Sequence, residues 1–189
     1  FVSAIALLLS TSVVSFAKVV GDKIVLGAAV SLTGKYSSNG VHTQNGYNMA
    51  VERINSMGGI KVGGKTYKFE IIYYDDESNP KRAAQLAERL ISQDGVEFML
   101  GPYSSGLTKA MAPVTEKYGV PMVEANGASR SLFTKGYKYL FAVLAPANLY
   151  LDVAIRTAVE LNGGKGVNIA MAFEQDAFSQ DVRLGIVDA

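Results

Sequence analysis

Apolar and polar positions along the chain form alternating blocks: short apolar runs typical of strands, and segments with the three- and four-residue spacing of helices. Residues 24–30 (IVLGAAV) are a continuous apolar run, which is typical of a strand buried on both faces of a parallel sheet. A polar loop, SLTGKYSSNG, follows. A helix is predicted next because its apolar residues recur at three- and four-residue spacing: Tyr47, Ala50, Val51, Ile54 and Met57.

The same alternation continues in the next block. The glycines of KVGGK predict a hairpin turn before a second strand at residues 67–75 (YKFEIIYYD). Asn79 suits a helix N-cap and Pro80 the first helical position, where the missing N–H of proline is not needed. The predicted helix has one apolar face, formed by Ala83, Leu86, Ala87, Leu90 and Ile91.

Further strands are predicted at EFMLG, VPMVE and residues 139–146, with a helix that ends near Tyr118 between the first two. A helix at about residues 148–161, a strand at 167–173 (VNIAMAF) and a helix start near Ser179 repeat the alternation. Such alternation predicts α/β architecture with doubly wound parallel sheets. Because one strand and two helices cannot close a sheet, we expect the last part to be the incomplete start of a second lobe.

The first seventeen residues, FVSAIALLLSTSVVSFA, are apolar and uncharged, with small residues at Ser15 and Ala17. This pattern predicts the apolar part of a secretory signal peptide cleaved after Ala17. The run is shorter than the roughly 20 residues that a membrane-spanning helix needs. Since it has neither an initial Met nor a basic region, we expect the chain to begin within its signal. The prediction is an exported, periplasmic protein.

Composition narrows the classes of partner. The formal net charge is +1 and there is no basic cluster, which argues against nucleic acid and anionic membranes as partners. The chain has no Cys, which excludes disulfides, thiolate metal sites and a lipid-modified N-terminal cysteine. With a single His, His42, no metal or cofactor is predicted.

Candidate ligand loops follow from the predicted sheet, because ligands bind beyond the carboxyl ends of parallel strands. Four loops qualify: SLTGKYSSNG, DDESN, GPYSSG and ANGAS. Ser104 and Ser105 lie between a strand and a helix start, where free backbone N–H groups favour a carboxylate. One serine alone is better explained as an N-cap. The pair favours ligand binding because ANGAS supplies a second hydroxyl loop on the next strand.

Other polar residues leave alternatives open. Glu124 ends the strand VPMVE and either points into the crevice, where it accepts a hydrogen bond from a ligand ammonium or amide, or is a solvated strand terminus. The acidic run at residues 75–77 is better explained by a capped helix start than by a metal site. His42 is expected on a helix surface, and Tyr103 is a candidate at the rim of the site.

Catalytic motifs are missing from the sequence. It contains no G-x-S-x-G, G-x-x-x-x-G-K-[ST], H-E-x-x-H or strand-linked G-x-G-x-x-G motif. A Ser–His triad would have to use His42. The sequence therefore predicts a protein that is not an enzyme.

Residues 24–133 resemble the periplasmic solute-binding proteins of branched-chain amino acid ABC transporters. The resemblance rests on IVLGAAVSLTGKYSSNG, NGYNMAVERINSMGGI, YDDESNPKRAAQLAERLI, FMLGPYSSGLTKAMAPVTEKYGVPMV and NGASRSLF, in this order. It implies two α/β lobes that close on a ligand like a hinged trap. The first lobe would span residues 18–144, and the second would begin at 145 and be incomplete at 189.

The resemblance also implies ligand contacts. Ser105, which ends G-P-x-x-S, would bind the ligand carboxylate. The loop Asn126-Gly127-Ala128-Ser129 would form a second clamp, in which Ser129 supplies a hydroxyl and Gly127 a carbonyl for the ligand amine.

Three departures from the family pattern concern ligand specificity. Phe178, in FEQDAFSQD, matches the aromatic residue that covers the ligand and lacks the hydroxyl of the common tyrosine. Asn39 stands where amino-acid binders often have an aromatic residue, and no match is found for the family's acidic partner of the ligand ammonium. An aromatic acid, an amide or a small carboxylate therefore stays open beside a branched-chain amino acid.

Two functions are compatible with the resemblance. The first is a monomeric transport receptor that captures a small carboxylate or amino acid and delivers it to the membrane permease of an ABC transporter. The second is the sensing domain of an amide or amino-acid receptor or regulator. An exported enzyme would need catalytic groups from outside these residues.

Overall fold

Residues 19–188 are described by a computed structural model of the chain. The predicted signal segment and its cleavage site lie outside the described residues. The predicted division into lobes at residue 145 stays a prediction.

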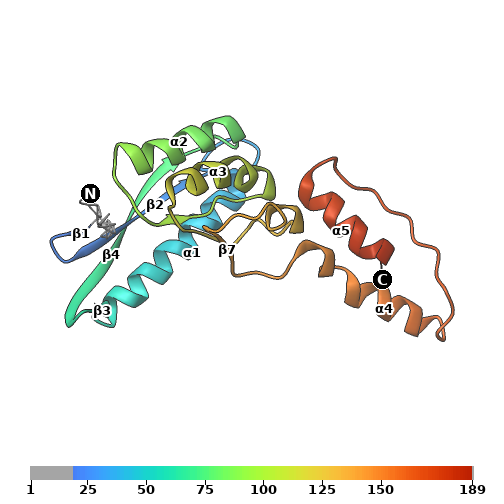
Figure 1. The fold of residues 1–189 in the computed structure, drawn as a ribbon. Helices are drawn as coiled ribbons and strands as arrows, with labels where there is room; N and C mark the ends of the chain where they lie inside the picture. The colour runs from blue at the N-terminus through green and yellow to red at the C-terminus, as the bar shows by residue number, and fades with distance from the viewer. Residues whose placement is uncertain (1–18, 189) are drawn as a thin grey trace, which may run out of the picture.

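A twisted seven-stranded sheet is the centre of the described N-terminal region (Figure 1). In chain order its strands are β1 (Val19–Val20), β2 (Lys23–Val30), β3 (Ile60–Val62), β4 (Lys65–Asp75), β5 (Met99–Leu100), β6 (Met122–Glu124) and β7 (Leu140–Ala142). The spatial order is β3-β4-β2-β5-β6-β7, and β1 pairs with β2. The five strands from β4 to β7 pair in parallel. The predicted parallel sheet is confirmed, with β1 and β3 added antiparallel.

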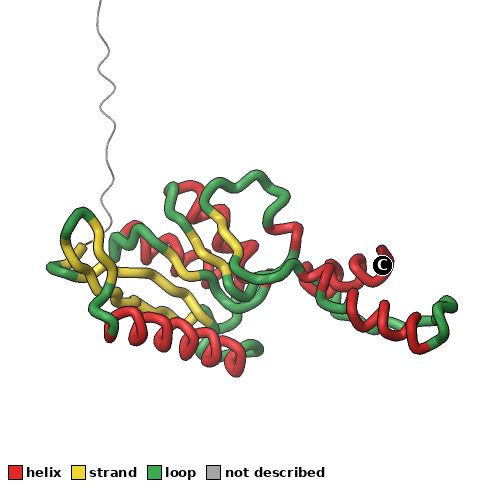
Figure 2. The backbone as a smooth tube through the Cα atoms, turned by 90° about the horizontal axis from the view of Figure 1, so that it is seen from below, coloured by secondary structure: helices red, strands yellow, loops and turns green. Residues whose placement is uncertain are grey.

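Helices cover both faces of this sheet. In chain order they are α1 (Ser37–Ser56), α2 (Pro80–Ser92), α3 (Ser105–Tyr118), α4 (Asp152–Leu161) and α5 (Ala177–Asp188), with short 3₁₀ turns η1 (Arg130–Leu132) and η2 (Ala147–Leu149). Helix α1 lies on one face, and α2 and α3 lie together on the other (Figure 2). The sheet with helices on both faces agrees with the predicted doubly wound α/β class.

The main hydrophobic core lies between the sheet and the helix pair α2 and α3. The predicted apolar face of α2 is buried here, apart from the partly buried Ile91, and packs against Leu107 and Met111 of α3. Helix α2 begins as the sequence predicts, because the Asn79 side-chain oxygen accepts hydrogen bonds from the backbone N–H groups of Lys81 (2.9 Å) and Arg82 (3.1 Å). Burial of this face sets the position of α3, which packs against β6 and β7.

The polar loop after β2 is shorter than predicted, since α1 begins at Ser37 and includes the last four residues of SLTGKYSSNG. Gly40 explains this early start. A Cβ at Gly40 would collide with the Ser31 backbone carbonyl, so glycine lets the first turn of α1 lie directly against the end of β2.

The predicted strand at residues 167–173 is wrong for the described structure. This segment is extended but has no ladder partner among residues 19–188. A strand needs a neighbour to take up its backbone N–H and C=O groups. Helix α5 begins at Ala177 and packs on η2, where Gly185 lies against the Asn148 carbonyl. Helices α4 and α5 and the segment between them extend away from the sheet (Figure 1).

Candidate ligand-binding site

Three loops meet at the edge of the sheet where β2, β5 and β6 end: residues 31–36, 101–104 and 125–129. The strand order reverses direction between β2 and β5, because the chain passes from β2 to β4 on one side and continues through β5, β6 and β7 on the other. Such a reversal opens a crevice in which α/β proteins bind ligands. Three of the four loops selected from the sequence border this crevice, and the fourth follows β4.

An aromatic pair spans the reversal point. The rings of Tyr36, after β2, and Tyr103, after β5, meet edge to face with their centroids 5.5 Å apart. Both side chains are partly buried. The pair gives the two loops an apolar contact, and it leaves Tyr103 at the rim, where the sequence analysis places it.

Ser104 is the N-cap of α3. Its hydroxyl oxygen accepts a hydrogen bond from the Leu107 backbone N–H at 3.3 Å. Its backbone has φ of 86°, a conformation that non-glycine residues rarely adopt. The cap interpretation therefore holds for Ser104. The strained backbone turns the chain so that the N-terminus of α3 borders the crevice.

Ser105 and Ser129 join two of the loops. The Ser105 hydroxyl oxygen accepts a hydrogen bond from the Ser129 backbone N–H at 3.1 Å, and the two residues are 1% and 0% exposed. The Ser129 hydroxyl pairs with that of Ser131 at 2.8 Å. Because the Ser105 oxygen is the acceptor, the proton of its hydroxyl is not used in this bond. The structure brings the predicted serines together, and their ligand contacts stay predictions.

Glu124 differs from both sequence-based alternatives. It is 0% exposed, so it is not a solvated terminus, and both of its carboxylate oxygens are taken up by hydrogen bonds within the protein instead of being directed into the crevice. One carboxylate oxygen, Oε1, accepts hydrogen bonds from the N–H groups of Asn126 (2.5 Å) and Gly127 (2.6 Å). The other, Oε2, bonds to the Thr108 hydroxyl at 2.6 Å. Burial raises the pKa of the Glu124 carboxyl to about 7, although these hydrogen bonds oppose the shift.

Thr108 is a site residue that the sequence analysis missed. Its hydroxyl lies 2.9 Å from the Ser104 carbonyl oxygen as well as 2.6 Å from Glu124. The sequence did offer a signal for the bond to Ser104, because a helical Thr commonly donates its hydroxyl to the backbone carbonyl four residues before it. The bond to Glu124 depends on the packing of α3 against β6, which the spacing does not show.

Asn39 lies in the first turn of α1 and not in the predicted loop. It borders an open hollow of about 470 Å³, which also includes Tyr103 and Asn126. His42 lies on the exposed surface of α1, as expected, and borders the same hollow. The hollow adjoins the loops after β5 and β6 and offers space for a ligand side chain.

Phe178 lies in the first turn of α5, where its ring meets Tyr150 edge to face at 5.5 Å. The turn is capped by Asp176, which accepts a hydrogen bond from the Phe178 N–H at 2.8 Å. Just before it, Glu174 forms an ion pair with Lys35 of the loop after β2 at 2.6 Å. The segment that carries Phe178 is therefore linked to the crevice side of the sheet.

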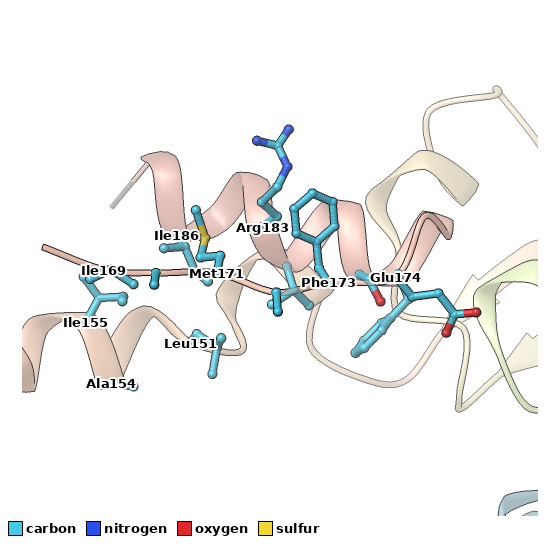
Figure 3. Close-up of a pocket in the computed structure, with 14 residues that line it drawn as sticks. Leu151, Ala154, Ile155, Ile169, Met171, Phe173, Glu174, Arg183 and Ile186 are labelled. Carbon is cyan, nitrogen blue, oxygen red and sulfur yellow. The ribbon is translucent and has the colours of Figure 1, made fainter.

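A second cavity of about 440 Å³ lies between α4, residues 169–174 and α5. Its lining is mostly aliphatic and aromatic, with Ile155, Ile169 and Ile186 directed toward one another (Figure 3). Phe178 borders this cavity too. The cavity offers few polar groups to orient a carboxylate.

The acidic run after β4 secures the neighbouring loop. Asp75 accepts hydrogen bonds from the Leu32 N–H at 2.9 Å and the Thr33 hydroxyl at 2.7 Å. The buried Asp76 accepts one from the Ser31 hydroxyl at 2.6 Å. These carboxylates therefore hold the loop after β2 in place, in addition to the helix start that the sequence predicts.

Two kinds of feature are absent from residues 19–188. No group of three or more His, Cys, Asp or Glu side chains in this range is arranged to hold a metal ion. No helix in the same range is both long enough and apolar enough to span a membrane.

A family model described as "Periplasmic binding protein" matches residues 23–189. The chain is 27% identical over 170 residues to a leucine-, isoleucine-, valine-, threonine- and alanine-binding protein of Pseudomonas aeruginosa, covering 89% of this chain and 44% of that protein. It is 28% identical over 175 residues to a Leu/Ile/Val-binding protein of Rhizobium johnstonii, covering 93% and 45%. The chain thus spans less than half the length of these relatives.

Solved structures agree in fold. A branched-chain amino acid transporter substrate-binding protein of Streptococcus pneumoniae, in complex with isoleucine, has a TM-score of 0.61 and 29% identity, covering 71% of this chain and 39% of its own. A solute-binding protein of an ABC transporter from R. palustris, in complex with 4-hydroxybenzoate, has a TM-score of 0.72 and 25% identity, covering 88% and 43%.

Proposed function

The chain belongs to the periplasmic binding protein family, and on this premise we propose that it is part of a solute-binding receptor of an ABC importer. The receptor is not an enzyme: it captures a small amino acid or carboxylate in the crevice beyond β2, β5 and β6 and presents it to a membrane permease. It acts as a monomer in the periplasm after removal of its signal peptide.

The Ser105–Ser129 pair is the observation that supports this proposal. Two loops from neighbouring strands are joined here at the N-terminus of α3, where backbone N–H groups and the helix dipole favour a negative charge. Ser105 keeps a hydroxyl proton to donate. In the proposed complex, Ser105 and the N-terminus of α3 bind the ligand carboxylate, and Ser129 and Ala128 enclose it from the second loop.

The rest of the ligand is proposed to lie between the two lobes. The Gly127 carbonyl accepts a hydrogen bond from a ligand ammonium where there is one. Asn39 and Tyr103 border the hollow on the first side, and Phe178 closes over the ligand from the second. Closure is driven by the ligand's higher affinity for the closed state.

Both amino acids and aromatic acids suit this arrangement. The relatives from P. aeruginosa and R. johnstonii are named for amino acids, and the R. palustris protein is in complex with 4-hydroxybenzoate. A carboxylate is common to these ligands. We therefore propose that the site recognises the ligand carboxylate, and that the identity of the ligand side chain is to be determined by measurement.

The test is a thermal-shift panel of matched acids and amides: L-leucine with L-leucinamide, and 4-hydroxybenzoate with 4-hydroxybenzamide. A ligand at 100 times its Kd stabilises the folded protein by about 2.7 kcal/mol. We expect an acid to raise the melting temperature and its amide to leave it unchanged. An amide that binds as well as its acid would contradict carboxylate capture by Ser105.

A further inference from the structure

Glu124 is a buried ionisable group that the proposed ligand contacts do not use. It is completely buried, and a carboxylate in such a place requires several hydrogen bonds to offset its desolvation. Three of its hydrogen bonds come from elements that border the crevice, with the Asn126 and Gly127 N–H groups and the Thr108 hydroxyl as partners. Its position is therefore tied to the shape of the site.

The space around the carboxylate fits it closely. A Cβ at Gly101 would collide with Oε2, and a Cβ at Gly127 would lie 3.1 Å from the carboxyl carbon. Two glycines from two crevice loops thus leave room for this side chain. The close fit means that the Glu124 carboxylate and the loop at residues 125–129 cannot move independently.

The hydrogen bonds form a chain between the two ligand loops. Oε1 holds the N–H groups of Asn126 and Gly127, two to three residues before Ser129. Oε2 reaches the Thr108 hydroxyl, which also lies against the Ser104 carbonyl at 2.9 Å. The chain therefore runs from the loop after β6, through Glu124 and Thr108, to the residue before Ser105.

From this geometry we propose that Glu124 is a positioning residue, which holds the loop at residues 125–129 in the conformation that places Ser129 beside Ser105 for ligand capture. It does so without touching the ligand. The inference rests on the proposed function only in naming the purpose of this conformation. The link between the carboxylate and the loop can be measured without any ligand.

The direction of the hydrogen-bond chain depends on the protonation of Glu124. A threonine hydroxyl has one proton, so Thr108 can donate either to Oε2 or to the Ser104 carbonyl, but not to both at once. With Glu124 ionised, Thr108 donates to Oε2. With Glu124 protonated on Oε2, the carboxyl donates to the Thr108 oxygen, and the Thr108 hydroxyl in turn donates its hydrogen bond to the Ser104 carbonyl.

The groups that face Glu124 determine whether any other group titrates in the same pH range as its carboxyl. The loop after β5 contributes Gly101, α3 contributes the Thr108 hydroxyl, and the loop after β6 contributes two N–H groups. Helix α1 contributes Tyr47, whose hydroxyl donates to the Gly101 carbonyl at 2.7 Å. Burial and the nearby Glu124 charge raise the pKa of Tyr47 above its usual value, so Tyr47 stays neutral where Glu124 titrates.

The first measurement follows the backbone amides of the full chain by NMR between pH 3.5 and 8.5, a range that includes the ordinary pKa of a glutamate carboxyl, with no ligand present. We expect the Asn126 and Gly127 amide resonances to shift together with a midpoint near pH 7. In Glu124→Gln this shift should vanish. A flat response of both amides in the unmodified protein would overturn the proposal, and this outcome does not depend on whether the variant folds.

Glu116→Gln is the matched control. The Glu116 carboxylate also accepts two consecutive backbone N–H groups, from Lys138 (2.9 Å) and Tyr139 (3.1 Å), at the other end of α3. This variant should leave the pH response of Asn126 and Gly127 unchanged. If it abolished that response as Glu124→Gln does, the effect would be a general loss of packing and the proposal would fail.

The second measurement is calorimetric affinity for L-leucine and 4-hydroxybenzoate over the same pH range. For whichever probe binds, we expect Glu124→Gln to weaken affinity about tenfold or more and to remove its pH dependence near 7, while Glu116→Gln keeps both. Equal affinity and pH profile in Glu124→Gln would overturn the positioning role. If the amides titrate as expected but neither probe binds, the proposed ligand class is wrong and the link between Glu124 and the loop stands.

Discussion

The Ser129 backbone N–H donates a hydrogen bond to the Ser105 hydroxyl across 3.1 Å, and this bond joins the loop after β6 to the first residue of α3. Both residues are buried, so the bond is shielded from competing water. A ligand carboxylate placed at the N-terminus of α3 would lie next to a hydroxyl whose orientation is already determined. Preorganisation of this kind reduces the entropy lost on binding.

Ser105→Ala should weaken ligand binding by about 1–3 kcal/mol. The variant removes a donor to the ligand carboxylate and also the acceptor of the Ser129 N–H. Isothermal titration with the best acid from the thermal-shift panel measures the loss. Ser92→Ala, which removes an exposed hydroxyl at the end of α2, is the matched control and should not change affinity; an equal loss in both would exclude a specific contact.

Ser105→Ala and Ser129→Ala should be non-additive in binding. The residues are joined by a hydrogen bond and are proposed to share one ligand carboxylate. The second substitution should therefore cost less binding free energy in the presence of the first than it does in the unmodified protein. A double-mutant cycle by titration calorimetry should give an interaction energy of about 0.5–3 kcal/mol. Additive losses would mean that the two serines act independently.

Gly127→Ala should destabilise the folded protein by about 1–3 kcal/mol, because the added Cβ would lie 2.5 Å from the Thr108 hydroxyl oxygen. Urea denaturation measures this change. The control is Gly46→Ala in α1, whose Cβ would meet nothing within 4 Å and which should stabilise the helix by about 0.5–1 kcal/mol. Equal effects at the two glycines would contradict the close packing around Glu124.

Glu124 should make folding stability fall as pH rises toward neutrality. Burial raises the pKa of its carboxyl from 4.5 to about 7 in the folded protein, so between these values the folded protein binds more protons than the unfolded chain. Stability therefore decreases with rising pH across this range and levels off above pH 7. The loss should amount to roughly 3 kcal/mol.

The measurement is the difference in free energy of unfolding between the unmodified protein and Glu124→Gln at pH 5 and pH 8. Other carboxyl groups contribute nearly equally to both proteins, so their effects cancel in this difference. A difference that does not change with pH would show that Glu124 keeps an ordinary pKa.

The two ion pairs between the sheet region and the C-terminal segment should differ in strength. Asp181 is 7% exposed and accepts hydrogen bonds from both the backbone N–H (2.8 Å) and the side-chain Nε (2.9 Å) of Arg130. Asp181→Ala should cost about 1.5–3 kcal/mol. Glu174→Ala should cost less than about 1 kcal/mol, because the Lys35–Glu174 pair is exposed on both sides.

Urea denaturation at low salt and in 0.5 M NaCl compares the two variants. Salt should reduce the cost of Glu174→Ala further, since exposed charges are screened, and should change that of Asp181→Ala little. A larger cost for Glu174→Ala than for Asp181→Ala would mean that the exposed Lys35–Glu174 pair contributes more to holding the C-terminal segment against the sheet region, contrary to the prediction.

The sequence predicts well those features whose cause lies within a few residues. Asn79 caps α2 through N–H groups two and three positions away, and Gly63 and Gly64 form the hairpin turn with φ of 57° and 81°. Glu124 shows where a local signal existed but was not used. In β6, Met122 and Glu124 are both buried and Val123 is exposed, so the period of two places the carboxylate on the core side.

The sequence by itself therefore determined the order of the main strands and helices as far as residue 142, their capping and turns, and the likeness to a binding-protein family, because backbone dihedrals, caps and apolar period act over short distances. Only the tertiary structure decided that the Ser129 N–H meets Ser105, that Thr108 reaches Glu124, and that residues 167–173 have no strand partner in the described chain. Those outcomes depend on which elements pack together, and hydrogen bonds between distant residues form only after that packing has offset the entropy of bringing them close.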